Sequence, residues 1–219
     1  MGGAGKTDNH NLAAKLALRR TMLRDFKPDG PLSVCDCFSG GEILWTRLRA
    51  EFAIAEYLAL DVKPKRGRLK LDSLRYLQNQ KWRHNVIDLD AYGSPWAHWL
   101  EVVKRKIPCL VFLTVGNSIW KRQPKMALAE IGIHFAIPPA IEDQLVDLIL
   151  HHCLAAPLES GGGLGIGRAM EAENLGGSAR YFGIRLETKP TAKYAKHAKA
   201  DPPPKTTTIP PAAANQSGS

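Results

Sequence analysis

The sequence has few cysteines, no long apolar run and fewer acidic than basic residues, and each shortage excludes a class of protein. Its four cysteines do not form the paired framework of a small secreted domain, and buried thiols in a reducing cytosol are the better interpretation. No apolar run reaches ~18 residues, so we expect no membrane-spanning helix. The N-terminus has no apolar signal core, so we expect a cytoplasmic protein.

The charge is unevenly distributed. The chain carries 30 Lys and Arg against 21 Asp and Glu, for a net charge of +9. The residues after Glu187 include five lysines and one aspartate, so four of the nine positive charges belong to this tail. The remaining excess is consistent with a polyanionic partner such as a nucleic acid.

Two familiar phosphate-binding glycine motifs are missing. The opening Met1–Thr7 has no earlier glycine and no preceding strand, so it is not a phosphate loop. The first predicted strand, Leu32–Phe38, runs into Ser39-Gly40-Gly41 and then a helix, without the Gly-x-Gly-x-x-Gly spacing of dinucleotide sites. Asp36 inside this stretch would repel phosphate. It suits a ligand with an amino group and a positive centre instead.

The pattern of the chain predicts an α/β fold in three parts. Residues 1–30 contain a basic helix, Asn11–Phe26, whose Lys15, Arg19, Arg20 and Arg24 we interpret as a solvated face. Residues 31–187 alternate strands and helices and end in an antiparallel hairpin, Ile166–Glu173 with Ala179–Glu187. Residues 188–219 are rich in Pro, Lys, Thr and Ala, and we expect them to be disordered.

The other elements follow from apolar runs and turn residues. Strands are predicted at Tyr57–Val62, Arg68–Asp72, 85–91 and Ile107–Thr114, and helices at Glu42–Phe52, Ser73–Gln80, Trp96–Lys106 and Ile141–Leu154. Gly161–Gly167 is predicted to be a loop. The sheet should be mostly parallel, with only the closing hairpin antiparallel.

The most informative stretch is 85–96. Val86, Ile87 and Leu89 form the apolar run of a central parallel strand, and Gly93 stops it. Asp90 therefore lies at the carboxyl end of a strand, the edge of an open α/β sheet where ligands bind. A turn closed by an acid is the simpler alternative.

Three other features concern binding. Asp61 lies about 20 residues beyond the glycine turn, the spacing at which a carboxylate accepts hydrogen bonds from a ribose diol. Trp120, Lys121 and Arg122 combine an aromatic ring with two cations, which favours either a nucleic-acid contact or a solvated loop with one packed Trp. The adjacent His151-His152 of a helix diverge by about 100°, so we predict no metal site.

Over about residues 32–187, the order of elements resembles the class I S-adenosylmethionine-dependent methyltransferases. The features that carry this resemblance are three strands ending in Asp36, Asp61 and Asp90, a further acid at Asp72, and a closing hairpin. The stretch Asp88-Leu89-Asp90-Ala91-Tyr92-Gly93-Ser94-Pro95 is similar to the Asp-Pro-Phe-Gly-Ser-Pro motif of tRNA guanine-N2 dimethyltransferases. It is more loosely similar to the Asp-Pro-Pro-Tyr motif of DNA amino-methyltransferases. Ala91 stands where these motifs have proline.

The resemblance implies a Rossmann-like methyltransferase fold, S-adenosylmethionine as cofactor, and methylation of an exocyclic base nitrogen in DNA or RNA. It implies that Asp90 is the catalytic acid, with Asp88 as the next candidate, and that Tyr92 stacks on the target base. The implied cofactor residues are Asp36, Phe38, Gly40, Asp61 and Asp72. Substrate contacts are assigned to Trp96, Trp120, Lys121 and Arg122. The alternative is a methyltransferase-like module that binds nucleic acid or protein without turnover.

Overall fold

Strands and helices alternate through the first half of the chain. The computed structural model describes residues 11–40, 43–62, 70–79, 81–91, 95–116, 163–172, 179–189 and 207–209, together with residues 129 and 150. The helices are α1 (Leu12–Asp25), α2 (Ile43–Arg49), α3 (Ser73–Gln78) and α4 (Trp96–Lys104). The strands are β1 (Leu32–Asp36), β2 (Ile54–Ala59), β3 (Val86–Leu89), β4 (Cys109–Gly116), β5 (Gly163–Ala172), β6 (Ala179–Lys189) and β7 (Thr207–Ile209).

These strands form one sheet in the order β2-β1-β3-β4-β6-β5-β7. The pairs from β2 to β4 are parallel, whereas β6 pairs antiparallel with both β4 and β5. The predicted α/β class, with a mostly parallel sheet and a closing antiparallel hairpin, is therefore confirmed. Because the chain passes from β1 to β2 on one side and returns to β3 on the other, the strand order reverses between β1 and β3. In such sheets this reversal opens a crevice at the carboxyl ends of the two strands.

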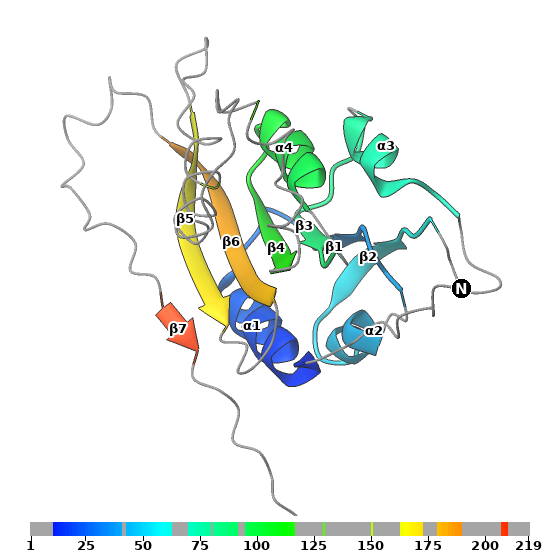
Figure 1. Ribbon diagram of the computed structural model, residues 1–219. Coiled ribbons are helices and arrows are strands. Elements are labelled where there is room, and N and C mark those ends of the chain that lie inside the picture. Colours follow the sequence, from blue (N-terminus) through cyan, green and yellow to red (C-terminus); the bar gives the residue numbers. More distant parts are fainter. Residues whose placement is uncertain are drawn as a thin grey trace, which may run out of the picture.

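Helices cover both faces of the sheet, with α1 and α2 on one side and α3 and α4 on the other (Figure 1). Central strands in this position are buried on both faces, which explains the long apolar run in β4 and the burial of every residue of β3, Asp88 included. Val86 and Phe112 pack in the core beneath α1 and α2. Ile87 and Val111 pack in the core that includes residues of α3 and α4.

The basic helix is packed more deeply than its sequence predicts. Leu18 and Met22 of α1 lie in the same core as Val86, so α1 is packed against the sheet. Lys15 and Arg19 are 7% and 1% exposed, and the prediction of a solvated basic face is wrong for these two residues. Both have carboxylate partners at the end of β3, which compensate the cost of burying a cation.

Two described segments differ from the predicted elements. β2 begins at Ile54, three residues before the predicted strand, and ends before Asp61. No strand covers Arg68–Asp72 within the described residues there: Lys70 makes a single bridge to Asp61. Asp72 instead caps α3, because its carboxylate accepts hydrogen bonds from the first backbone N–H groups of that helix.

The closing hairpin is longer than predicted. β5 begins at Gly163, inside the predicted glycine loop, and its pairing with β6 shifts register at Gly167, as at a β-bulge. At the other end, 188–189 continue β6 and 207–209 pair with β5, so these described parts of the predicted disordered tail are extended strands. The predicted helix Ile141–Leu154 lies outside the described residues except for Leu150, which is helical and buried.

The described helices include none that is long and apolar enough to cross a membrane.

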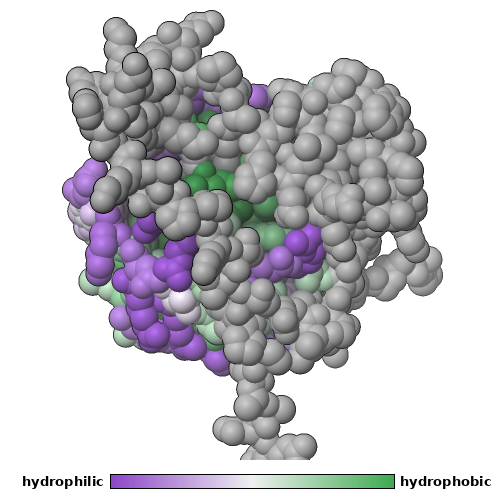
Figure 2. Space-filling model, turned by 90° about the vertical axis from the view of Figure 1, so that its left-hand side faces the viewer, coloured by the Kyte–Doolittle hydropathy of each residue, from purple (hydrophilic) through white to green (hydrophobic). Residues whose placement is uncertain are grey.

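On the side of the molecule seen in Figure 2, hydrophilic residues gather at the lower left and hydrophobic residues are visible near the centre.

Candidate active site

The acids predicted to end the first and third strands meet at the point where the strand order reverses. Asp36 of β1 and Asp88 of β3 are directly paired in the sheet register. Asp90 follows two residues after Asp88, just beyond the carboxyl end of β3. Three carboxyl groups from two neighbouring strands therefore lie at or just below the edge where such folds bind ligands.

Asp90 is held by donors from two other elements. The Lys15 ammonium lies 2.7 Å from both Oδ1 and Oδ2, and the Thr114 hydroxyl of β4 donates to Oδ1 at 2.7 Å. Burial tends to raise the pKa of Asp90, but the charges of Arg19 and Lys15 outweigh it and hold that pKa below its ordinary value. The side chain is 21% exposed. Asp90 is therefore an ionised carboxylate that solvent can still reach.

Asp88 is part of the core rather than of the open edge. Its side chain is 2% exposed and its two oxygens accept hydrogen bonds from Arg19, at 2.7 and 2.9 Å. The indole N–H of Trp45 donates to Oδ2 at 2.6 Å. The Arg19 guanidinium also lies 4.9 Å from the centre of the Phe112 ring. With its charge balanced and its side chain covered, Asp88 is placed to anchor α1.

Asp36 is buried as well, but among the described residues no cation hydrogen-bonds to its carboxyl group. The Tyr57 hydroxyl donates to Oδ2 at 2.9 Å, and the Phe38 backbone N–H lies 3.3 Å from Oδ1. Burial, with Asp88 nearby, raises the pKa of Asp36 well above its ordinary value, so this carboxyl keeps its proton. Being 4% exposed, it is not open to a ligand in this structure. The cluster thus pairs Asp90 with Lys15 and Asp88 with Arg19, whereas Asp36 is the acid whose neutral form burial favours.

The glycine turn and the acid after β2 contact each other. Gly40 has φ of 48°, a left-handed conformation that glycine adopts readily. Its N–H donates to Oδ2 of Asp61 at 3.0 Å. Asp61 is partly exposed, and a carboxylate has room for further donors such as the two hydroxyls of a ribose.

Phe38 and the start of α3 form the next part of the edge. The Phe38 ring lies 4.6 Å from that of His98 on α4, and the hydroxyl of Ser73 is 2.9 Å from His98 Nε2. Burial lowers the pKa of His98 to about 4, so the imidazole is neutral at physiological pH. Asp72 is exposed and already occupied in capping α3.

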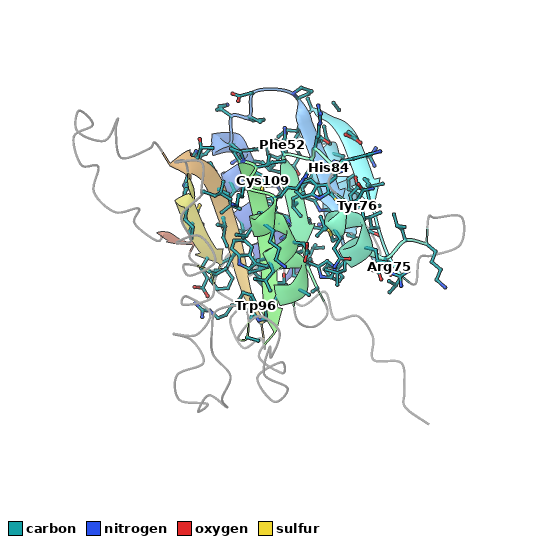
Figure 3. All side chains as sticks on the ribbon, turned by 90° about the horizontal axis from the view of Figure 1, so that it is seen from above. Phe52, Arg75, Tyr76, His84, Trp96 and Cys109 are labelled. Atoms are coloured by element: carbon teal, nitrogen blue, oxygen red, sulfur yellow. The ribbon has the colours of Figure 1, made fainter. Side chains whose placement is uncertain are left out.

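α4 begins at this same edge of the sheet. Figure 3 places Trp96 at the end of the molecule opposite Phe52, His84 and Cys109. The Trp96 ring is 1% exposed, and its indole N–H has no hydrogen-bond partner within the part of the chain that the structure describes. The ring is thus a core residue and is not open to a nucleic-acid base here.

Among the described residues, no group of three or more His, Cys, Asp or Glu is placed to hold a metal ion. The Cys35 and Cys37 sulfurs, at the end of β1 and just beyond it, lie 3.7 Å apart, and both residues are buried.

No protein-family model and no curated protein matches the chain by sequence. Among solved structures, the chain is similar to Trm1 from Pyrococcus horikoshii in complex with S-adenosyl-L-methionine, with a TM-score of 0.51 and 15% identity. The match covers 84% of this chain and 56% of Trm1, so the chain spans little more than half of that protein's length. An S-adenosylmethionine-dependent methyltransferase from Archaeoglobus fulgidus also matches, at a TM-score of 0.44 and 14% identity, over 80% of this chain and 94% of that one.

The similarity to Trm1 gives the chain a methyltransferase-like fold. Asp90, Asp61, Gly40 and Phe38 lie at the carboxyl edge of its sheet, whereas Asp36 and Asp88 lie buried beneath α1 and α2. The predicted aromatic residue Tyr92 and the predicted substrate residues Trp120, Lys121 and Arg122 lie outside the described residues.

Sequence reasoning missed the residues that hold the acids, namely Lys15, Arg19, Trp45 and Thr114. A signal for two of them was present: Lys15, Arg19 and Met22 follow the i, i+4, i+7 spacing of one helix face. A cation at two positions of such a stripe indicates an acidic partner on the surface that the helix covers.

Proposed function

We propose that this protein is an S-adenosylmethionine-dependent methyltransferase that acts on an exocyclic amine of a base in DNA or RNA. The observation that carries the proposal is the state of Asp90, which is ionised, partly exposed and located where the strand order reverses. Its similarity in sequence to the acid of known amine-methylating motifs supports the same assignment.

The residues around the glycine turn fit the proposed cofactor. Asp61 would accept hydrogen bonds from the ribose hydroxyls, and Gly40 leaves space for close approach to the backbone. Phe38 lies beside them at the end of β1. When bound, the cofactor supplies an electrophilic methyl group on a positively charged sulfur. An edge with carboxylates suits that charge better than it suits a phosphate.

Asp90 has the chemistry that amine methylation requires. An exocyclic amine is a weak nucleophile because its lone pair is delocalised into the ring, and the nitrogen becomes cationic as the new bond forms. A fixed carboxylate can accept an N–H and stabilise that charge. Oδ1 of Asp90 already accepts from Lys15 and Thr114, whereas Oδ2 accepts only from Lys15 within the described residues. Oδ2 therefore has capacity for one further donor.

The nucleic-acid part of the proposal depends on residues of the sequence. Tyr92 would stack on a base taken out of its helix, and Trp120, Lys121 and Arg122 would contact the strand. Trm1 is a protein whose solved complex contains S-adenosyl-L-methionine, which favours the cofactor. The net charge of +9 favours a polyanionic substrate.

The test is transfer of a labelled methyl group to mixed tRNA, other RNA and DNA, together with calorimetry of cofactor binding. Asp61→Ala should weaken cofactor binding by roughly 1.5–3 kcal/mol, because ligand hydroxyls lose their acceptor. Asp90→Asn should lower turnover by at least ~100-fold and change cofactor affinity by less than a few-fold. An active Asp90→Asn protein would refute the catalytic assignment.

A second function, binding without turnover, is favoured by one observation. The Asp90 carboxylate already has three hydrogen bonds from two side chains, and its charge is compensated by Lys15. Such an acid stabilises a new positive charge less strongly than an unpaired one. A wild-type protein that binds the cofactor but transfers no methyl group to any of these nucleic acids would establish the binding function instead.

A further inference from the structure

Lys15 has an unusual position for a lysine. It lies in the first turn of α1 and its side chain is only 9% exposed. The ammonium group lies 2.7 Å from each oxygen of Asp90, which is 75 residues away in sequence, and 5.1 Å from the centre of the Tyr181 ring. Burial of an ammonium group is costly, so its partner must compensate it closely.

The contacts restrain the carboxylate of Asp90 as well as neutralise it. An ammonium group that bonds both oxygens opposes rotation of the carboxylate about its last side-chain bond. The hydroxyl of Thr114 adds a second restraint from β4, on Oδ1. Two elements on different sides of Asp90 thus hold the group in one orientation and leave acceptor capacity on Oδ2.

We propose that Lys15 is a positioning residue of the candidate active site: its ammonium group holds the Asp90 carboxylate ionised and in one orientation, so that Oδ2 can accept an N–H of the substrate amine. This inference rests on the proposed methyl transfer. Lys15 acts through Asp90 and is not itself placed against the substrate. The first helix of the chain is therefore part of the catalytic apparatus rather than an appended basic segment.

The surroundings of Asp90 decide what the loss of Lys15 would do. Arg19 on α1 also favours the ionised form of Asp90. The charges of Asp88 and Asp90 raise the pKa of Asp36 on β1, so the neutral Asp36 adds no repulsion to Asp90. Thr114 stabilises the ionised form by its hydrogen bond. Without Lys15, one of the two cations is lost and the neighbouring charges remain, so Asp90 should hold its proton to a higher pH.

The test compares Lys15→Met with Lys15→Arg and with the control Arg20→Met. Met keeps the length of the side chain and removes the charge, whereas Arg keeps the charge. Arg20 is on the same helix but pairs with Glu51, away from Asp90. One readout is the pH dependence of kcat and KM for methyl transfer. The other is the titration of the Asp90 carboxyl carbon by NMR, assigned with Asp90→Asn.

Lys15→Met should lower kcat by ~10–100-fold near neutral pH, because a misplaced reacting group loses about this much. KM for S-adenosylmethionine should stay within a few-fold. The acidic limb of the kcat profile and the Asp90 titration should move together to higher pH. Lys15→Arg should retain most of the wild-type profile, and Arg20→Met should shift neither readout. A Lys15→Met protein with the wild-type kcat profile would overturn the proposal, and so would an unchanged Asp90 titration.

The two readouts separate this inference from the proposed function. If wild type transfers no methyl group, the proposed function fails, but the titration still reports whether Lys15 keeps Asp90 ionised. If Lys15→Met does not fold, Lys15→Gln serves the same purpose, because its amide removes the charge yet can still donate to Asp90. A Lys15→Gln protein whose Asp90 titrates as in wild type would overturn the inference.

Discussion

The Arg19–Asp88 pair makes the sharpest prediction about stability. Arg19→Met removes a guanidinium that is 1% exposed and leaves the Asp88 carboxylate, which is 2% exposed, without its counter-ion. Removing one partner of a buried ion pair typically costs about 3–5 kcal/mol, since the remaining charge is no longer compensated. A domain is usually stable by about 5–15 kcal/mol, so this single change should remove a large part of that margin.

The assay is denaturant unfolding followed by tryptophan fluorescence. Trp45 is a suitable reporter because its indole N–H donates to Asp88. The double variant Arg19→Met/Asp88→Asn should regain much of the lost free energy of unfolding. The Asn amide keeps an acceptor for the indole N–H of Trp45 and removes the unpaired charge.

The matched control is Arg20→Met, one position along the same helix. Its partner Glu51 is exposed, and exposed ion pairs contribute little to stability. If Arg19→Met destabilises the protein no more than Arg20→Met does, the reasoning about burial is refuted. If the double variant is as unstable as Arg19→Met alone, the loss comes from packing of the side chain and not from the charge.

Three further predictions concern the same face of the sheet. Asp36 keeps its proton in the folded state, whereas the unfolded chain loses it above about pH 4, so folding stability should fall as the pH rises from there. The free energy of unfolding of Asp36→Asn should therefore rise relative to that of wild type as the pH increases from 5 to 8. If the two free energies of unfolding change in parallel with pH, this prediction is wrong. Gly183→Ala should lower the free energy of unfolding by about 1–3 kcal/mol, measured with denaturant, because the added Cβ would lie 2.8 Å from Met22 Cγ. Adding Met22→Ala to this variant should restore part of the lost stability. Deletion of residues 1–26 removes Lys15 and Arg19, the two cations of the cluster. The truncated protein should no longer unfold cooperatively when unfolding is followed by near-UV circular dichroism. A sharp unfolding transition would show that α1 is dispensable for folding.

The strands and their terminal acids were predictable because these features are local. The run around Val86 is apolar and short, and Asp90 after it occupies the carboxyl edge by the geometry of any parallel sheet. The spacing of Asp61 from the glycine turn predicted a ribose contact, whereas its hydrogen bond from the Gly40 N–H was not predicted.

The partners of those acids were not predictable by the same reasoning. The periodicity of α1 indicates which residues share a helix face, but not which face packs against a distant strand. Lys15 and Arg19 pair with Asp90 and Asp88, which lie 75 and 69 residues away in the sequence. The cap that Asp72 makes was missed for the opposite reason. Capping of α3 is a purely local contact, and it was overlooked in favour of a long-range role.

The separation of α1 from its acids has a consequence for the order of folding. α1 is made long before β3, and at about 5–20 residues per second the 75 residues from Lys15 to Asp90 take roughly 4–15 s to synthesise. Until then Lys15 and Arg19 have no buried acid to meet, and desolvating them would be unfavourable. α1 should therefore remain undocked until β3 has joined β1. Contacts of such long sequence separation form slowly, so closure of this charge cluster is expected to be a late step in folding.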